Sequence, residues 1–234
     1  MLKITGTNEP WLNRLDHLIC EVPDIDRAIA LFTSFGFPVA WPKGRFWPQG
    51  LTAGIALGGL NLEFIQLDAG APDEPAIRTL VFEPVNLDSA VHQLQKLGFP
   101  LRVADKWESN PELLKLRGFH ERDCQTPQLI CQNAFPESKS SFDFFICAYS
   151  EFLKMHLVPS AFPNSPKVHS ITLGTPKLSE DWAFANTIWG LPSHPSDVTI
   201  QFAESLQHPN EVVEIATSLG SLDLSHWTSR FRFT

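Results

Sequence analysis

The feature that most constrains this chain is a segment that occurs twice. Val22 to Pro38 reads VPDIDRAIALFTSFGFP, and Pro84 to Pro100 reads PVNLDSAVHQLQKLGFP. A shift of 62 residues places Asp24 on Asn86 and aligns the two Gly-Phe-Pro endings. Self-similarity at a fixed offset indicates one structural unit used more than once. The chain is therefore expected to contain two similar modules.

Each copy predicts a short amphipathic helix. Asp24 and Asn86 are N-cap residues, because their side-chain oxygens accept hydrogen bonds from unpaired backbone N–H groups. Apolar residues then recur at helical spacing. Gly36 and Gly98 supply the left-handed residue that ends a helix, and the proline that follows two residues later prevents its continuation.

Strands are predicted on both sides of these helices. One precedes each helix, at Leu15–Val22 and at Ile77–Phe82. Gly58-Gly59 predicts a tight hairpin turn. A charged insertion is expected at about 106–123, with a helix at Pro111–Arg117. The other predicted strands of this part are Val39–Trp41, Leu51–Leu57, Leu60–Leu67, Leu101–Ala104, Gln128–Ala134 and Phe142–Ala148.

A third, weaker copy follows a proline-rich linker. It contains a predicted strand at Val168–Gly174, a helix at Lys177–Trp189, and strands at Val198–Ala203, Val212–Thr217 and Arg230–Phe233. The prediction is an α+β fold with a first βαβββ module at 1–70, a second at 75–158 and a partial third at 167–234. The modules are expected to form a curved, largely antiparallel sheet or an open barrel, with the helices outside.

The composition argues against several classes of protein. The chain has 234 residues, with 18 Lys and Arg against 26 Asp and Glu, for a formal net charge of −8. An acidic chain without a basic cluster is a poor partner for nucleic acid or an anionic membrane. No run of 18 apolar residues predicts a membrane span. The partner expected instead is a small molecule, and the chain is expected to be a monomer or a homodimer.

The cysteines indicate a reducing compartment. The chain has four, Cys20, Cys124, Cys131 and Cys147, and none forms a close CxxC pair. Three of them lie in apolar runs, which is typical of buried free thiols. We therefore expect a cytoplasmic protein without disulfides.

Two polar residues stand out within apolar strands. On the first strand His17 shares a face with Leu15 and Ile19, and on a later strand Glu63 shares a face with Asn61 and Ile65. An imidazole and a carboxylate in such positions are costly unless they pair or bind a metal. Together they suit zinc, nickel, iron or manganese. A hydrogen-bonded His–Glu pair in the core is the alternative.

The segment LDHLICEVPDIDRAIALFTSFGF at Leu15–Phe37 and the segment GGLNLEFIQLD at Gly58–Asp68 resemble the vicinal oxygen chelate superfamily. Its members include glyoxalase I, extradiol dioxygenases and bleomycin-resistance proteins, and the chain looks most like its glyoxalase-like domain proteins. The resemblance implies paired βαβββ modules around a divalent metal ion, with a His from the first strand and a Glu from the last strand of each module.

The resemblance implies His17 and Glu63 as two metal ligands. The second module has Thr79 at the position of His17, and Asp143 close to that of Glu63. The third offers His169 and Glu214, whose separation of 45 residues is close to the 46 between His17 and Glu63. The proposed metal set is His17, Glu63, His169 and Glu214, with Glu63 or Glu214 moving the proton. A degenerate site without metal is the alternative.

The loop after the first helix departs from the family pattern. Phe46 stands where these proteins often carry a histidine, and no asparagine follows Thr52. The loop is rich in Trp and Phe, with Arg45 as its cation. Arg45 and Trp47 are therefore candidates for contacting a substrate at an apolar pocket. An ordinary aromatic cluster at a sheet edge is the alternative.

Two functions follow from these residues. The first is that of a metal-dependent lyase, isomerase or dioxygenase, in which a divalent ion binds two neighbouring oxygens of a small substrate. The second is that of a metal-free protein that binds and sequesters a small molecule on the same scaffold. Thr79, the altered loop and the many aromatic residues favour the second.

Overall fold

The computed structural model describes residues 11–47, 49–70, 73, 75–116, 119–137, 143–156, 166–189, 198–204, 211–218 and 220–223. Its main element is an eight-stranded sheet with the order β2-β3-β4-β1-β5-β8-β7-β6. The strands are β1 (Leu12–Glu21), β2 (Val39–Trp47), β3 (Gly50–Ala56), β4 (Asn61–Leu67), β5 (Ala76–Pro84), β6 (Leu101–Ser109), β7 (Gln128–Pro136) and β8 (Asp143–Tyr149).

The sheet consists of two halves with the same topology. In each half the first strand lies beside the last strand in parallel, as β1 pairs with β4 and β5 pairs with β8. The halves join where β1 and β5 run antiparallel, with His17 opposite Val81 and Ile19 opposite Thr79. Under the offset of 62 residues, His17 corresponds to Thr79 and Ile19 corresponds to Val81. Each of the two pairs therefore maps onto the other, and a pseudo-twofold axis relates the two halves of the sheet.

The two repeated helices form as predicted. They are α1 (Ile25–Ser34) and α2 (Leu87–Lys96). The Asp24 side chain accepts from the backbone N–H of Arg27, and the Asn86 side chain accepts from that of Ser89. Gly36 and Gly98 have φ values of 86° and 83°, so both helices end in the left-handed residue that the sequence indicates.

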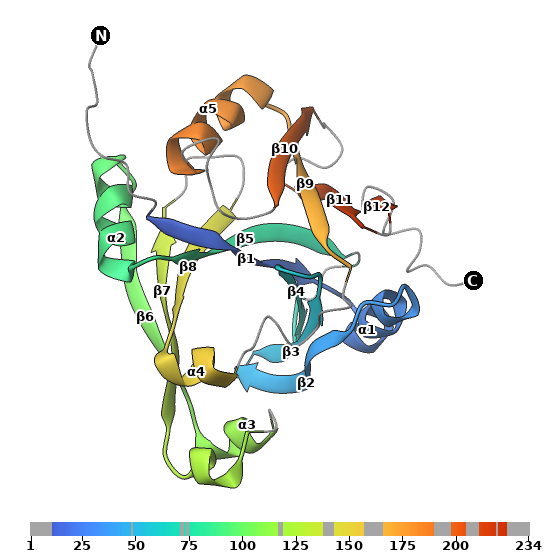
Figure 1. Cartoon of the computed structure of the whole chain (residues 1–234), viewed down its shortest axis with the longest axis vertical. Helices are drawn as coiled ribbons and strands as arrows, with labels where there is room; N and C mark the ends of the chain where they lie inside the picture. The colour runs from blue at the N-terminus through green and yellow to red at the C-terminus, as the bar shows by residue number, and fades with distance from the viewer. Residues whose placement is uncertain are drawn as a thin grey trace.

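The main sheet curls, and its two faces have different neighbours. Figure 1 shows β2, β3 and β4 on one side of β1 and β5, and β8, β7 and β6 on the other. Helices α1 and α2 pack on the convex face. The concave face is covered in part by α3 (Pro111–Leu116), by the 3-10 helix η1 (Glu121–Cys124) and by α4 (Glu151–His156). The α+β class with a curved repeated sheet is confirmed.

A second sheet lies against the convex face. It has the order β10-β9-β11-β12, with β9 (Val168–Thr175), β10 (Thr199–Glu204), β11 (Glu211–Thr217) and β12 (Gly220–Asp223), and α5 (Leu178–Trp189) follows β9. Here β9 pairs in parallel with β10, the strand directly after the helix, and antiparallel with β11. This topology differs from that of the two modules in the main sheet, where the parallel partner is the third strand after the helix.

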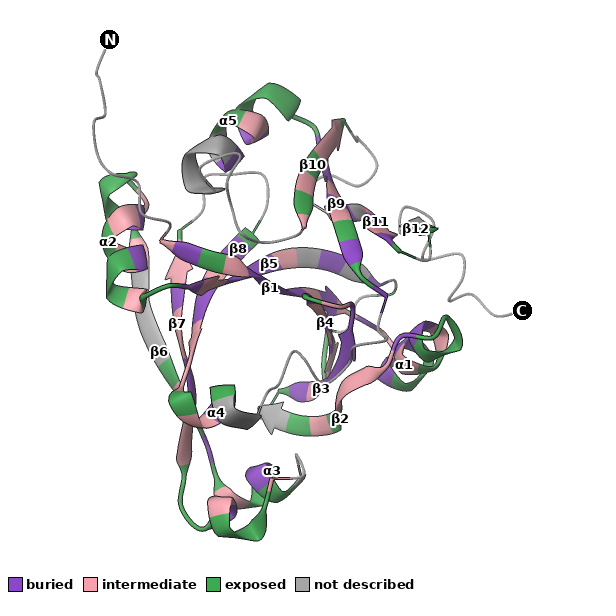
Figure 2. Ribbon diagram, viewed as in Figure 1, coloured by how far each residue is buried: buried purple, intermediate pink, exposed green. Residues whose placement is uncertain are grey.

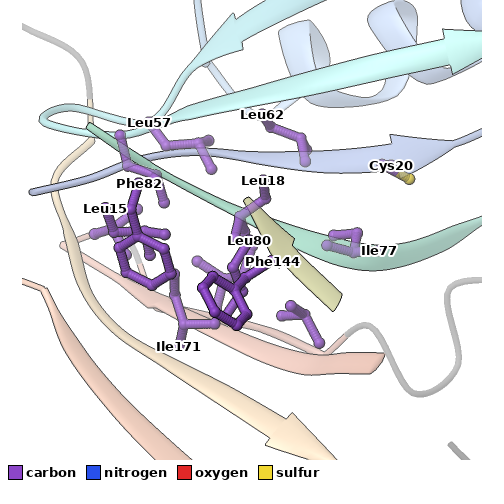
Figure 3. Packing of buried hydrophobic residues seen from close by; sticks show 14 of the residues in the cluster. Leu15, Leu18, Cys20, Leu57, Leu62, Ile77, Leu80, Phe82, Phe144 and Ile171 are labelled. Atoms are coloured by element: carbon purple, nitrogen blue, oxygen red, sulfur yellow. The ribbon is translucent and has the colours of Figure 1, made fainter. Parts of the chain in front are cut away.

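The largest core lies between the two sheets and under α1 and α2. Leu18 and Phe64 from the main sheet and Ile171 from β9 belong to the same buried cluster. Figure 3 shows the rings of Phe82 and Phe144 close to Ile171. Figure 2 shows buried positions along the strands and exposed positions on the outer faces of the helices. A smaller cluster on the concave face includes Val81, Leu114, Cys124, Ile130, Cys131, Cys147 and Leu153.

Some elements differ from the sequence predictions. β2 continues to Trp47 and β6 to Ser109, because antiparallel pairing with β3 and β7 extends these strands through polar residues. The first residues of the insertion predicted at 106–123 are therefore part of a strand. Helix α4 and strand β12 were not predicted. The strand predicted at Arg230–Phe233 lies outside the described residues. The module boundaries at 1–70, 75–158 and 167–234 stay a prediction.

Because both sheets share one core, we expect a single substitution in the second sheet to destabilise the whole molecule. Ile171 is fully buried. Ile171→Ala should lower the free energy of unfolding by about 2–5 kcal/mol through lost burial and the cavity left behind. Urea denaturation monitored by circular dichroism should show one transition, at a lower urea concentration than in the wild-type protein.

His169→Ala, at an exposed position of the same strand, is the control and should change stability by less than about 0.5 kcal/mol. Loss of only part of the signal in Ile171→Ala would contradict a shared core.

Candidate functional site

A β-bulge in β1 positions the polar cluster of the concave face. Leu15 lies opposite Phe82 and His17 lies opposite Val81, so Asp16 is an extra residue between two consecutive partners. A bulge of this kind turns a side chain away from the alternation of the strand. Asp16 and His17 therefore contact each other, although neighbours in a regular strand point to opposite faces.

His17 lies between two carboxylates. Its Nδ1 is 2.8 Å from Oδ2 of Asp16, and its Nε2 is 3.3 Å from Oε2 of Glu63. The Thr52 hydroxyl donates to Oε1 of Glu63 at 2.6 Å. Glu63 lies on β4, next to β1, where it pairs with Ile19, so the parallel register of these strands brings the imidazole and the carboxylate together.

Further side chains hold Asp16 from the other side. Arg14 donates to Asp16 Oδ1 at 2.5 Å and to Glu83 at 2.8 Å. The Tyr149 hydroxyl donates to Asp16 Oδ2 at 2.5 Å. The result is a network in which the cations Arg14 and His17 alternate with the carboxylates of Glu83, Asp16 and Glu63.

Burial and the two carboxylates set the charge of His17. Burial lowers its pKa, but the hydrogen bonds to Asp16 and Glu63 and their negative charges outweigh burial and raise the pKa to about 9. Burial would raise the pKa of Asp16, but its bonds to His17, Arg14 and Tyr149 lower it overall. His17 is therefore an imidazolium at neutral pH, held between two negative charges. Burial and the charge of Asp16 raise the pKa of Tyr149 well above its ordinary value.

The members of the network differ in exposure. The side chains of Asp16 and His17 are 2% and 7% exposed, whereas that of Glu63 is 18% exposed. Glu63 is thus the carboxylate beside His17 that reaches the surface of the concave face. Asp16 lies behind the imidazole and orients it.

Aromatic side chains surround this polar cluster. The ring of Phe145 meets the His17 ring edge-on, with 6.3 Å between centroids, and Phe135 lies 4.9 Å from Phe145. On the other half of the sheet, Gly54 pairs with Glu63. A Cβ atom at Gly54 would lie only 2.3 Å from the ring of Trp41, so the indole lies directly against the glycine backbone. Trp41, Phe135 and Phe145 are only partly buried.

The second half of the sheet has no counterpart to the His–Glu pair. The repeat places Thr79 at the position of His17. Ile19 pairs with Glu63 in the first half, and its counterpart Val81 pairs with Phe145 in the second. Phe145 therefore stands at the position of Glu63. Asp143, expected close to that position, lies two residues earlier, opposite Thr79, and is exposed.

The structure brings together His17 and Glu63 but not His169 and Glu214. His169 is exposed on β9, and Glu214 lies on β11 opposite Thr172. Both strands belong to the second sheet, across the main core from the concave face. The similar separations in sequence do not give a similar geometry, because β11 runs antiparallel to β9 whereas β4 runs parallel to β1.

The two residues expected to contact a substrate lie on β2. Arg45 makes a bidentate ion pair with Asp68, at 2.6 and 2.8 Å, and both side chains are about half exposed. This pairing raises the pKa of Arg45 and lowers that of Asp68. The backbone of Trp47 pairs with Gly50, and its side chain lies outside what the structure describes. Trp41, earlier on the same strand, lies against Gly54, the strand partner of Glu63.

The donor set does not fit the metal centre that the resemblance implies. Such a centre takes a His and a Glu from each of two modules, and here the second module supplies Thr79 and Phe145. In the described part of the chain, no group of three or more His, Cys, Asp or Glu side chains is arranged to hold a metal ion.

Three residues that contact the His17–Glu63 pair were missed by sequence reasoning. Asp16 precedes His17 in an apolar strand, and two consecutive polar residues there are a signal of a bulge. Tyr149 is the only tyrosine of the chain and ends the apolar run of β8. Thr52 carries no comparable signal, because a threonine is ordinary in a strand.

Comparisons with known proteins identify the fold. No family model matches the chain, and a search of curated proteins finds no match. A hypothetical protein from Staphylococcus aureus has a similar structure, with a TM-score of 0.59 at 8% identity over 81% of this chain and 85% of that one. An extradiol ring-cleaving dioxygenase from B. fuscum gives a TM-score of 0.54 at 12% identity, over 89% of this chain and 57% of that one. A methylmalonyl-CoA epimerase from Mycobacterium tuberculosis gives 0.45 at 14% identity, over 64% and 97%.

The chain therefore shares its fold with an extradiol ring-cleaving dioxygenase, and extradiol dioxygenases belong to the superfamily that the sequence resembles. The candidate site around His17 and Glu63 lies on the first half of the main sheet. Among the described residues, no helix is long and apolar enough to cross a membrane.

The raised pKa of His17 makes stability depend on pH. The pKa is about 9 in the folded protein against an ordinary 6.5, so the charge of His17 stabilises the fold fully below pH 6.5. This contribution is lost as the pH rises through 9. Urea denaturation at several pH values should show the free energy of unfolding falling between pH 6.5 and 9, by on the order of 2–3 kcal/mol.

His17→Gln should remove most of this slope, whereas His92→Gln, at an exposed position on α2, should keep it. Equal slopes in wild type and His17→Gln would contradict the assignment. Asp16 causes a separate loss of stability at acid pH. Its pKa is lowered in the folded protein, so its negative charge stabilises the fold at pH values above the ordinary pKa of an aspartate. This contribution is lost as the pH falls through the lowered pKa.

The contact between Gly54 and Trp41 gives a second prediction for the site. Gly54→Ala should force the indole away from the strand and destabilise the protein by about 1–3 kcal/mol, as overpacking does. Gly59→Ala is the control, because a Cβ atom there meets nothing within 4 Å. Thermal melts of the two variants make the comparison. Equal melting temperatures would show that Trp41 does not lie against Gly54.

Proposed function

We propose that this protein binds a small oxygenated molecule on the concave face of its main sheet, without a metal ion, and that Glu63 is the group that meets the ligand. The observation that carries this proposal is the arrangement of His17 between Asp16 and Glu63, with Glu63 the more exposed of the two carboxylates. The metal-dependent lyase, isomerase or dioxygenase reaction implied by the resemblance lacks support from the donors of the second module.

The chemistry of the site indicates what kind of ligand suits it. An ionised carboxylate is an acceptor only, so a ligand that binds Glu63 must donate a hydrogen bond, as a hydroxyl group does. His17 and Thr52 fix the Glu63 carboxylate in one orientation. Such preorganisation favours binding, because little side-chain entropy remains to be lost.

The aromatic residues supply the apolar part of the site. Trp41, Phe135 and Phe145 are partly buried around the polar cluster, whereas Phe64 and Phe82 on the convex face are buried. Partly buried rings beside an oriented polar group are typical of small-molecule sites. We therefore propose a ligand with a flat apolar body and at least one hydroxyl group. The four cysteines are free, which supports a reducing compartment such as the cytoplasm.

Binding tests this function directly. Purified protein should be screened by thermal shift against phenols, hydroxyketones and hydroxy acids, with and without a chelator, and the best ligand measured by calorimetry. We expect the chelator to leave the dissociation constant unchanged. Glu63→Gln should weaken binding about tenfold or more, which corresponds to about 1.4 kcal/mol.

Asp143→Asn is the matched control, because Asp143 is an exposed carboxylate at the start of β8, on a strand of the same sheet. It should bind like wild type. Binding that requires added Zn²⁺, Ni²⁺, Mn²⁺ or Fe²⁺, and disappears with the chelator, would contradict the proposal and favour the metal-dependent reaction.

A further inference from the structure

The polar network of the concave face carries a net negative charge. It contains the three carboxylates of Glu83, Asp16 and Glu63 and the two basic side chains of Arg14 and His17. With His17 protonated, the network has one negative charge in excess, and with His17 neutral it has two. The sign of the charge is therefore the same in either protonation state, and it favours a positively charged ligand.

This excess charge reaches the surface at Glu63. The Glu63 side chain is 18% exposed, against 12% for Glu83 and 2% for Asp16. Glu83 has Arg14 as its partner, and Asp16 lies between Arg14 and His17. Glu63 is thus the carboxylate at which a ligand can neutralise the excess. A charged N–H group makes a stronger hydrogen bond to a carboxylate than a neutral hydroxyl group does.

The donors of the network are directed at groups of the protein itself. Arg14 donates to two carboxylates and to a backbone oxygen. The Tyr149 hydroxyl donates to Asp16, and the Thr52 hydroxyl donates to Glu63. A ligand carboxylate would therefore meet the negative charge of Glu63, while the donors of these side chains already serve the protein. The network is built to receive a donor rather than an anion.

The indole of Trp41 lies in the same row of the sheet as Glu63. Trp41 pairs with Gly54, and Gly54 pairs with Glu63, so the three positions share one face of neighbouring strands. A Cβ atom on Gly54 would lie 2.3 Å from Cδ2 and Cε3 of the indole and 2.4 Å from Cζ3. Three neighbouring atoms of a six-membered ring are equally distant only from points on the axis through the ring centre. The indole therefore lies face-on over Gly54.

The other face of this indole points away from the strand. Trp41 is only partly buried, so this face is the part of the ring that a ligand on the concave side can reach. A tryptophan ring attracts a cation that lies over its face, within about 6 Å of the ring centre. Neighbouring strands lie about 4.8 Å apart, so a cation over a ring that covers Gly54 is beside Glu63 on the next strand.

We propose that the ligand group that meets Glu63 is an ammonium group, held between the Glu63 carboxylate and the exposed face of the Trp41 indole. This inference rests on the proposed function. It narrows the ligand from hydroxylated molecules in general to those that also carry an amine. The aromatic rings of Phe135 and Phe145, near His17, remain the contacts for the apolar body of the ligand.

Three compounds with the same flat body and different charges test the inference. They are 2-phenylethylamine, which is a cation at pH 7.5, 2-phenylethanol, which is neutral, and phenylacetate, which is an anion. Calorimetry on the wild-type protein should show that the amine binds about tenfold or more tighter than the alcohol, which corresponds to about 1.4 kcal/mol. Phenylacetate should bind most weakly. Added salt should reduce the difference between the amine and the alcohol.

Variants assign this preference to the two side chains. Glu63→Gln removes the charge and should abolish the preference for the amine. Trp41→Leu keeps an apolar side chain but removes the ring, and should weaken binding of the amine several-fold more than binding of the alcohol. Asp143→Asn, which removes an exposed carboxylate elsewhere on the sheet, is the control and should keep the preference. Thermal melts identify any variant that does not fold, and the wild-type comparison is decisive without the variants.

The outcomes separate this inference from the proposed function. Equal affinities for the amine and the alcohol, a preference that persists in Glu63→Gln, or tightest binding of phenylacetate would each overturn the inference. If 2-phenylethanol binds and Glu63→Gln weakens it, while the amine binds no tighter, the proposed function stands and the ammonium assignment fails.

Discussion

The site of this protein depends on one interaction, the placement of a charged imidazole between two carboxylates inside a β-sheet. A buried charge is stable only when it is paired and hydrogen-bonded. His17 meets this condition through Asp16 on one ring nitrogen and Glu63 on the other. The bulge in β1, the parallel register of β1 and β4, and the contacts of Arg14, Thr52 and Tyr149 all serve to hold these three side chains in place.

The two halves of the sheet share a topology but carry different chemistry. The first half supplies the ionic network, and at the equivalent positions the second half supplies Thr79 and Phe145. The convex face is covered by the second sheet and by α1 and α2, so it serves stability. The concave face combines one oriented carboxylate with partly buried aromatic rings. This combination is the basis of the proposed recognition of a small molecule.

Much of the fold could be predicted because it follows from local patterns. The caps at Asp24 and Asn86 and the glycines that end α1 and α2 are visible in the sequence, and they repeat at a fixed offset. The extensions of β2 and β6 could not be predicted in this way, because they depend on pairing with neighbouring strands and not on local hydrophobicity. The topology of the second sheet was missed for a similar reason.

The site was predictable only in part. His17 and Glu63 could be found because polar residues are unusual in apolar strands. Asp16 and Tyr149 could not, because their contact requires the bulge and the curvature of the sheet. His169 and Glu214 were selected by sequence separation, and separation does not distinguish parallel from antiparallel neighbours.

The protonation state of His17 tests the central claim most directly. Nitrogen-15 NMR of the ring, with His17→Gln used to assign the signals, distinguishes an imidazolium from either neutral tautomer. We expect both ring nitrogens to carry protons at pH 7.5 and to titrate near pH 9. A neutral ring at pH 7.5, with Nε2 unprotonated and shifted by added Zn²⁺, would contradict this account, because His17 would then be a metal ligand rather than a buried cation.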